Sequence, residues 1–172
     1  ETAEGALSNE ASGTVPANST GSDPLYNAQW FLSNFGQQGG TAGEDIHQEG
    51  ALAQNVNGAG IRVAVVDEGV DIDHEDLKLN HASLLDYDYI DGATVDLAEH
   101  GTCVAGLALE RGFNGIGGRG VAPFANFVSY NILQDLTSAN EYDAMTRGKA
   151  TNHVSSNSWG DDNHGRYDLS AM

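Results

Sequence analysis

The sequence predicts an α/β fold in which a parallel β-sheet carries helices on both of its faces. The first observation behind this prediction is residues 60–67, a short apolar run rich in β-branched side chains. A run of that length and composition is typical of a buried strand in a parallel sheet. The second observation is the order of the segments, strand, loop, helix, strand, helix and strand. Such alternation brings successive strands back in the same direction and leaves the helices on the faces of the sheet.

The chain before this strand has two parts. Residues 1–22 are small, polar and acidic, with almost no apolar side chains to bury, so we expect a flexible acidic arm. We expect the folded domain to comprise residues 23–172. Within it, the apolar spacing of residues 43–55 predicts a helix that ends at Asn57-Gly58, a stop and turn signal.

The elements after the first strand follow from hydrophobic periodicity and from the positions of glycine and capping residues. The segment 100–111 consists of small and apolar residues, which suits a buried helix packed closely on a sheet. The predicted elements are a strand at 86–90, this helix, a glycine-rich loop at 112–120, a strand at 125–133, a helix at 138–151 with Ser138 as its N-cap, and a strand at 153–160.

The composition narrows the classes of function. Among 172 residues, Lys and Arg number 7 and Asp and Glu number 25, so the formal net charge is −18. Nucleic acid is excluded as an expected partner because phosphate binding needs positive charge; calcium, cationic substrates or a salty extracellular medium fit better. No apolar run approaches the roughly 20 residues of a membrane span. The single Cys103 forms no internal disulfide, and we expect an inert buried thiol that faces the sheet. Because the chain begins with Glu1, we expect that an upstream targeting segment has been removed.

Two residues carry the predicted chemistry. Asp67 ends the first strand, and ligands of α/β sheets collect beyond the carboxyl ends of the strands. His100 opens the following helix and could meet Asp67 above the sheet. A hydroxyl nucleophile needs a base such as histidine, and the base needs an acid that fixes its tautomer. Either residue alone is more often a turn or a helix start; together they predict an acid–base pair.

At these residues the sequence resembles the subtilisin-like serine proteases. Val63-Ala-Val-Val-Asp67-Glu-Gly-Val70, followed by His74-Glu-Asp76-Leu77, resembles the aspartate motif of that family, and His100-Gly-Thr-Cys-Val-Ala-Gly106 resembles its histidine motif. Gly120-Val-Ala-Pro123 resembles the segment that follows. The order Asp then His is that of the subtilisin triad. The resemblance implies a subtilisin-like three-layer fold, of which only the N-terminal part is present, and serine endopeptidase activity in which Asp67 and His100 are catalytic.

Shorter motifs indicate the kexin and proprotein convertase branch. Asp23-Pro24 with Gln29-Trp30 resembles the start of that branch's catalytic domain, and Ser158-Trp159-Gly160 resembles its substrate-binding strand. The family's Gly-Thr-Ser-x-Ala-x-Pro segment does not occur in the 172 residues, nor does the downstream oxyanion asparagine. We therefore expect the serine downstream or in a second chain, within the remainder of the catalytic domain, and expect this chain alone to be inactive. The alternative is an inactive truncated or nicked fragment that acts as a calcium- or partner-binding module.

The resemblance also implies a calcium site, since Ca²⁺ prefers several oxygen ligands in flexible geometry. Its implied ligands are the side chains of Asp23, Asp76 and Asn114 and the main-chain carbonyls of Arg111, Ile116 and Gly118. The alternative is that the two aspartates are ordinary helix or turn caps.

The resemblance implies further that Glu68, Ser158, Trp159 and Gly160 bind the substrate, an extended peptide or protein that pairs with a strand edge. Acids at Glu68, Asp161 and Asp162 favour basic residues before the cleaved bond, whereas Asn163 and Leu97 stand where that branch has acids. The alternative is that these acids only share the general surface charge. A propeptide or chaperone is an expected partner, and a secreted, extracellular location is expected.

Overall fold

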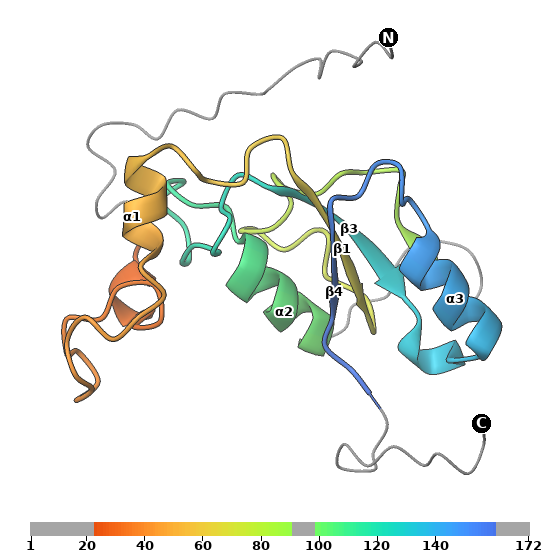
Figure 1. Cartoon of the computed structure of the whole chain (residues 1–172), viewed down its shortest axis with the longest axis horizontal. Helices are drawn as coiled ribbons and strands as arrows, with labels where there is room; N and C mark the ends of the chain where they lie inside the picture. The colour runs from red at the N-terminus through yellow and green to blue at the C-terminus, as the bar shows by residue number, and fades with distance from the viewer. Residues whose placement is uncertain (1–22, 91–98, 161–172) are drawn as a thin grey trace, which may run out of the picture.

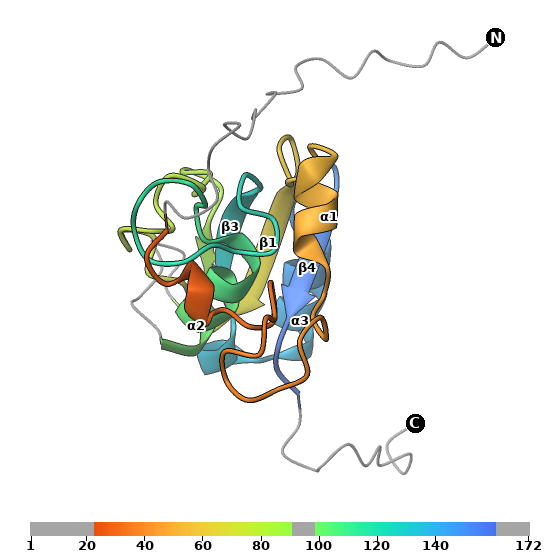
Figure 2. The same ribbon diagram turned by 90° about the vertical axis from the view of Figure 1, so that its left-hand side faces the viewer.

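The computed structural model describes residues 23–90 and 99–160. Its centre is a four-stranded sheet in the order β2-β3-β1-β4. The strands are β1 (Arg62–Asp67), β2 (Tyr87–Asp88), β3 (Asn126–Asn131) and β4 (Val154–Asn157). All three pairings are parallel, and β3, β1 and β4 run side by side (Figure 2). The predicted parallel sheet is confirmed. The predicted arm of residues 1–22 lies outside the described residues, and the division into arm and domain stays a prediction.

Two helices cover opposite faces of this sheet (Figure 1). The alternation of β1 explains the arrangement: Val63 and Val65 pack in the cluster that holds Ala105 and Leu109 of α2 (Glu99–Leu109). The next residue in each case points the other way, so Ala64 and Val66 pack with Ala144 of α3 (Ser138–Thr146). Both sides of β1 are therefore buried, which is why the strand is apolar throughout rather than alternating. The result is the three-layer α/β arrangement predicted from the sequence.

Several bounds differ from the predicted ones. Helix α1 is short (Gln48–Ala53), and Ile46 lies before it with 53% of its surface exposed. Helix α3 is capped one residue earlier than predicted, because the Thr137 side chain accepts the Asn140 N–H at 3.2 Å. Two 3₁₀ turns, η1 (Tyr26–Ala28) and η2 (Leu133–Asp135), complete the elements.

The carboxyl ends of β1, β3 and β4 meet at one edge of the sheet, because Asp67 is in register with Asn131 and Val66 with Asn157. Helix α2 begins at this same edge. Gly101 in its first turn allows the approach, since a β-carbon there would overlap the carbonyl oxygen of Gly69. Within residues 23–90 and 99–160, none of the helices has the length and apolar character needed to cross a bilayer.

Candidate active site

Asp67 is the buried acid of the site. Its side chain is 1% exposed at the end of β1. Its Oδ1 accepts a hydrogen bond from His100 Nδ1 at 2.8 Å and another from the Glu68 N–H at 2.9 Å. Its Oδ2 is buried and has no hydrogen-bond partner among the described residues. A buried carboxylate held in this way can fix the orientation and tautomer of the imidazole.

His100 is the exposed member of the pair, with 53% of its side chain accessible. Because Nδ1 faces Asp67, the tautomer with hydrogen on Nδ1 leaves Nε2 as the proton acceptor. The hydrogen bond that His100 donates to Asp67 and the negative charge of that carboxylate raise the pKa of His100 above 6.5. The pair thus presents a base whose proton can exchange, supported by an acid that solvent does not reach.

The loop after β1 holds the first turn of α2 in place. Glu68 Oε1 accepts the main-chain N–H of His100 at 2.8 Å, and Thr102 Oγ1 accepts the N–H of Asp71 at 2.8 Å. Free N–H groups of a helix's first turn favour such acceptors, especially charged ones. In this structure Glu68 therefore positions α2; the substrate role predicted for it stays a prediction.

The predicted substrate strand follows β4 at the same edge. Trp159 Nε1 donates to the Val66 carbonyl oxygen at 2.9 Å, and its ring packs on the cluster beneath α3. Ser158 and Gly160 on either side of it are exposed. The structure thus brings all three residues to the edge that carries Asp67. Leu97 and residues 161–163, which bear on specificity, lie outside the described ranges.

Asp76 and Asn114 form one half of the predicted metal site. Asp76 is 1% exposed; its Oδ1 accepts the Asn114 side-chain amide at 2.6 Å, while its Oδ2 is buried without a hydrogen bond from the described residues. Burial raises the pKa of Asp76, although the hydrogen bonds from the Asn114 side chain and from the main chain of Gly118 oppose the shift. Gly117 passes so close that a β-carbon would overlap Asp76 Oδ2. A buried carboxylate oxygen without a donor, beside the glycine-rich loop, fits a cation that prefers oxygen.

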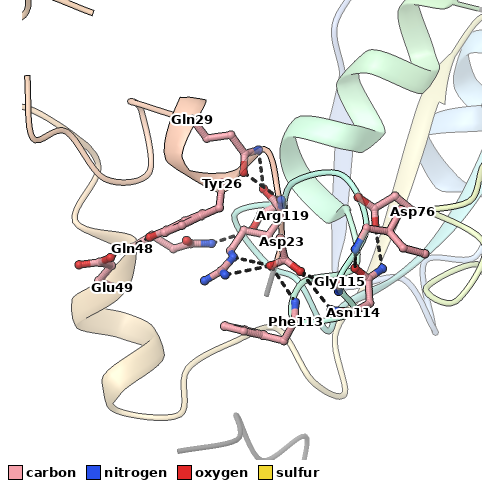
Figure 3. A network of polar contacts seen from close by, with 12 residues as sticks. Asp23, Tyr26, Gln29, Gln48, Glu49, Asp76, Phe113, Asn114, Gly115 and Arg119 are labelled. Carbon is pink, nitrogen blue, oxygen red and sulfur yellow. Dashed lines mark hydrogen bonds and ion pairs between the residues drawn. The ribbon is translucent and has the colours of Figure 1, made fainter. Parts of the chain in front are cut away.

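Asp23, the other predicted acidic ligand, has a different environment (Figure 3). Its Oδ1 accepts the N–H groups of Asn114 at 3.1 Å and Gly115 at 3.3 Å. Its Oδ2 accepts the Phe113 N–H at 2.9 Å and the Nε–H of Arg119, also at 2.9 Å. These donors join Asp23 to the glycine-rich loop, residues 112–120, and give both of its carboxylate oxygens hydrogen bonds. Over the described ranges, no group of three or more His, Cys, Asp or Glu side chains is arranged to hold a metal.

The sequence reasoning missed Arg119 and overlooked how Gln29 binds it. Gln29 Oε1 accepts the Arg119 N–H at 2.9 Å, and Gln29 Nε2 donates to the Arg119 carbonyl oxygen at 2.9 Å. The only local signal for Arg119 was its position: it is one of the seven basic residues of the chain and lies inside the glycine-rich loop.

The environment predicted for Cys103 is wrong. This thiol is exposed, and it lines an open cavity of about 620 Å³ between α2 and residues 25–31. It lies on the face of α2 that points away from the sheet.

Comparisons with known proteins agree with this geometry. The sequence model of the Subtilase family matches residues 58–171. Neuroendocrine convertase 2 of Caenorhabditis elegans is 34% identical over 84% of this chain and 24% of its own length. The dibasic-processing endoprotease of Schizosaccharomyces pombe is 34% identical over 84% of the chain and 21% of its length. The crystal structure of Aeromonas sobria serine protease with the chaperone ORF2 superposes with a TM-score of 0.73, at 33% identity, over 82% of the chain and 26% of that protein. The chain thus spans about a quarter of the length of these relatives or less.

Proposed function

The chain belongs to the subtilase family, and from this we propose that the complete protein is a serine endopeptidase of the kexin-like branch. The observation that carries the proposal is the 2.8 Å hydrogen bond between buried Asp67 and exposed His100 at the carboxyl edge of the sheet. Residues 23–172 belong, in this proposal, to the N-terminal part of the catalytic domain. The remainder of that domain supplies the nucleophilic serine and the oxyanion donors.

In the proposed reaction His100 Nε2 takes the proton of the serine hydroxyl as its oxygen attacks the carbonyl carbon of the peptide bond. The same nitrogen then returns the proton to the leaving amine. Asp67 stabilises the imidazolium that forms in between and holds the ring by its Nδ1–H. The loop after β1 fixes the position of the base through the hydrogen bond that the His100 main-chain N–H donates to Glu68.

The test is labelling of the complete folded protein with a fluorophosphonate probe, which reacts only with an activated serine. We expect labelling of the wild type and its loss in the His100→Ala variant. A folded wild-type protein that the probe does not label would contradict the peptidase proposal. It would favour the alternative of an inactive calcium- or partner-binding module.

We infer a preference for substrates with basic residues before the cleaved bond. The support is the acidic side chain of Glu68 next to Asp67, the net charge of −18, and the similarity to the dibasic-processing endoprotease of Schizosaccharomyces pombe. Fluorogenic peptides that end in Lys-Arg, Ala-Arg and Ala-Ala test it on the complete protein. Equal kcat/KM for all three would contradict the preference.

We propose that calcium binds at Asp76 and Asn114, with carbonyl oxygens of Arg111, Ile116 and Gly118. The support is the buried Oδ2 of Asp76, which has no donor among the described residues. When bound, the ion neutralises this carboxylate and ties the loop to the end of α2. We expect EDTA to lower the Tm of the complete protein and added calcium to restore it. An unchanged Tm would contradict the calcium proposal.

We also infer a secreted protein that takes peptides or proteins as substrates and that folds with a propeptide or chaperone. The acidic charge suits a salty medium and calcium, and the similar Aeromonas sobria protease has been solved with a chaperone. Co-expression with and without its upstream or neighbouring coding regions tests the chaperone: equal yields of active enzyme would contradict it.

A further inference from the structure

The strongest unexplained feature is a buried cation beside Asp23. The Arg119 side chain is 3% exposed and that of Asp23 is fully buried, and Arg119 Nη2 lies 2.9 Å from Asp23 Oδ2. The Arg119 guanidinium also lies between two rings, with its Cζ 3.8 Å from the ring centre of Tyr26 and 4.1 Å from that of Phe113. Figure 3 shows this group between the first turn of the domain and the glycine-rich loop. A cation in this position meets opposite charge at its edge and aromatic faces above and below.

The surroundings of Asp23 leave little room for a second cation. A carboxylate has about four lone-pair sites. Asp23 Oδ1 already accepts two main-chain N–H groups, and Oδ2 accepts one, together with the guanidinium. A metal ion at Asp23 would have to displace these donors and would stand close to a sealed positive charge. Asp76 differs, because its buried Oδ2 has no hydrogen-bond donor in the described ranges.

The pair also fastens two segments that are far apart in sequence. Asp23 and Arg119 are separated by 96 positions, and Gln29 brackets the main chain of Arg119 with two hydrogen bonds. Leu25 adds a bond from its N–H to the Gly117 carbonyl oxygen at 2.7 Å. The segment 23–32, here called the leading segment, is therefore held to the glycine-rich loop by contacts internal to the protein.

We propose that Arg119 is the resident cation of Asp23: the ion pair replaces a metal ion there, and calcium is confined to the Asp76 side of the loop. This inference rests on the proposed calcium site only in its second half. The first half, a metal-independent clamp between the leading segment and the loop, stands on the contacts above. The consequence is that chelators should weaken the loop at Asp76 and leave the attachment of the leading segment in place.

The experiment uses the complete protein and three variants: Arg119→Met, the double variant Asp23→Asn/Arg119→Met, and Lys149→Met as a control. Lys149 is exposed, so its variant removes one positive charge without opening a buried pair. Thermal melts are recorded in EDTA. We expect Arg119→Met to lower the Tm by about 5–10 °C, because Asp23 is left buried and unpaired, and Lys149→Met to lower it by less than about 2 °C. We expect the double variant to recover at least half of the loss.

Calcium affinity is then measured by titration calorimetry on the wild type and the double variant, which have the same local net charge. We expect the two affinities to agree within about threefold, whereas loss of a metal ligand or of its immediate support costs about tenfold or more. A tenfold loss in the double variant would overturn the proposal, as would an Arg119→Met variant that melts like Lys149→Met. If Arg119→Met does not fold, the double variant still decides: recovery of folding supports the pair. A wild type that binds no calcium refutes the calcium proposal alone, since the melts in EDTA still test the clamp.

Discussion

Two ion pairs of the molecule each contain a buried aspartate, but their cations are very different. Asp67 and Asp23 both have buried side chains, and their partners lie 2.8 Å and 2.9 Å away. The partner of Asp67 is His100, 53% of whose side chain is exposed, whereas the partner of Asp23 is Arg119, which is 3% exposed. One pair stands at the open edge of the sheet, and the other is sealed between aromatic rings.

The difference shows that the cation and its access to solvent decide what such a pair does. An imidazole loses and gains its proton near neutral pH, so an exposed histidine beside an acid can pass protons to a substrate. A guanidinium stays charged at any physiological pH, so a sealed arginine beside an acid can only hold structure. The first pair should therefore govern the rate of the reaction, and the second pair the stability of the fold.

The largest expected effect is that of Asp67→Asn on the rate. We expect kcat/KM of the complete enzyme to fall about 10⁴-fold, because the amide cannot hold the imidazole in the required tautomer or stabilise its cation. The Tm of Asp67→Asn should change far less than that of Arg119→Met. The Arg119→Met variant should in turn keep kcat/KM within about threefold per folded molecule. Kinetics and melting curves on both variants check this. Similar losses of rate in both would break the contrast.

Gly101→Ala should have the next largest effect. The new β-carbon would overlap the Gly69 carbonyl oxygen, so the first turn of α2 must shift and carry His100 with it. A displacement of about 1 Å costs about 100-fold in kcat/KM. The control is Gly50→Ala in α1, where the added carbon meets no atom within 4 Å and should leave the rate unchanged. Equal activity of the two variants would show that the close approach of α2 to Gly69 does not determine the position of His100.

A smaller effect is expected at Glu68, which holds His100 by its main chain rather than by its ring. We expect Glu68→Ala to lower kcat about tenfold, through loss of a charged acceptor at the first turn of α2. Glu68→Gln keeps an acceptor oxygen and should stay within about threefold. If both variants leave kcat unchanged and raise only KM, the positioning role of Glu68 is refuted.

The smallest effect concerns pH. The bond and charge of Asp67 raise the pKa of His100, so the protonated form extends above pH 6.5 and the acid limb of kcat/KM shifts upward with it. The same shift favours the folded state at low pH, and this contribution is lost as the pH rises through the folded-state pKa. In Asp67→Asn the titration of His100, followed by proton NMR, should move to lower pH. A shift upward, or none, would contradict the assigned coupling.

The local sequence determined a large part of this molecule. The apolar run of β1 predicted a strand buried on both faces, and the small residues of 100–111 predicted a helix in close contact with the sheet. It also determined that Asp67 ends one element while His100 starts another. Their meeting followed from the rule that parallel strands share a carboxyl edge, and the structure places the two atoms in hydrogen-bond contact.

Only the tertiary structure decided which acid meets which cation. The chain has 25 acids and 7 basic residues, and nothing near Asp23 in sequence selects Arg119, which lies 96 positions away. The face of Cys103 and the bond from Trp159 to Val66 were likewise settled by packing. The hydrophobic periodicity of a segment predicts which of its residues are buried, because this pattern can be read from the segment alone. Partners across long loops depend on the path of the chain, which the side chains fix only together.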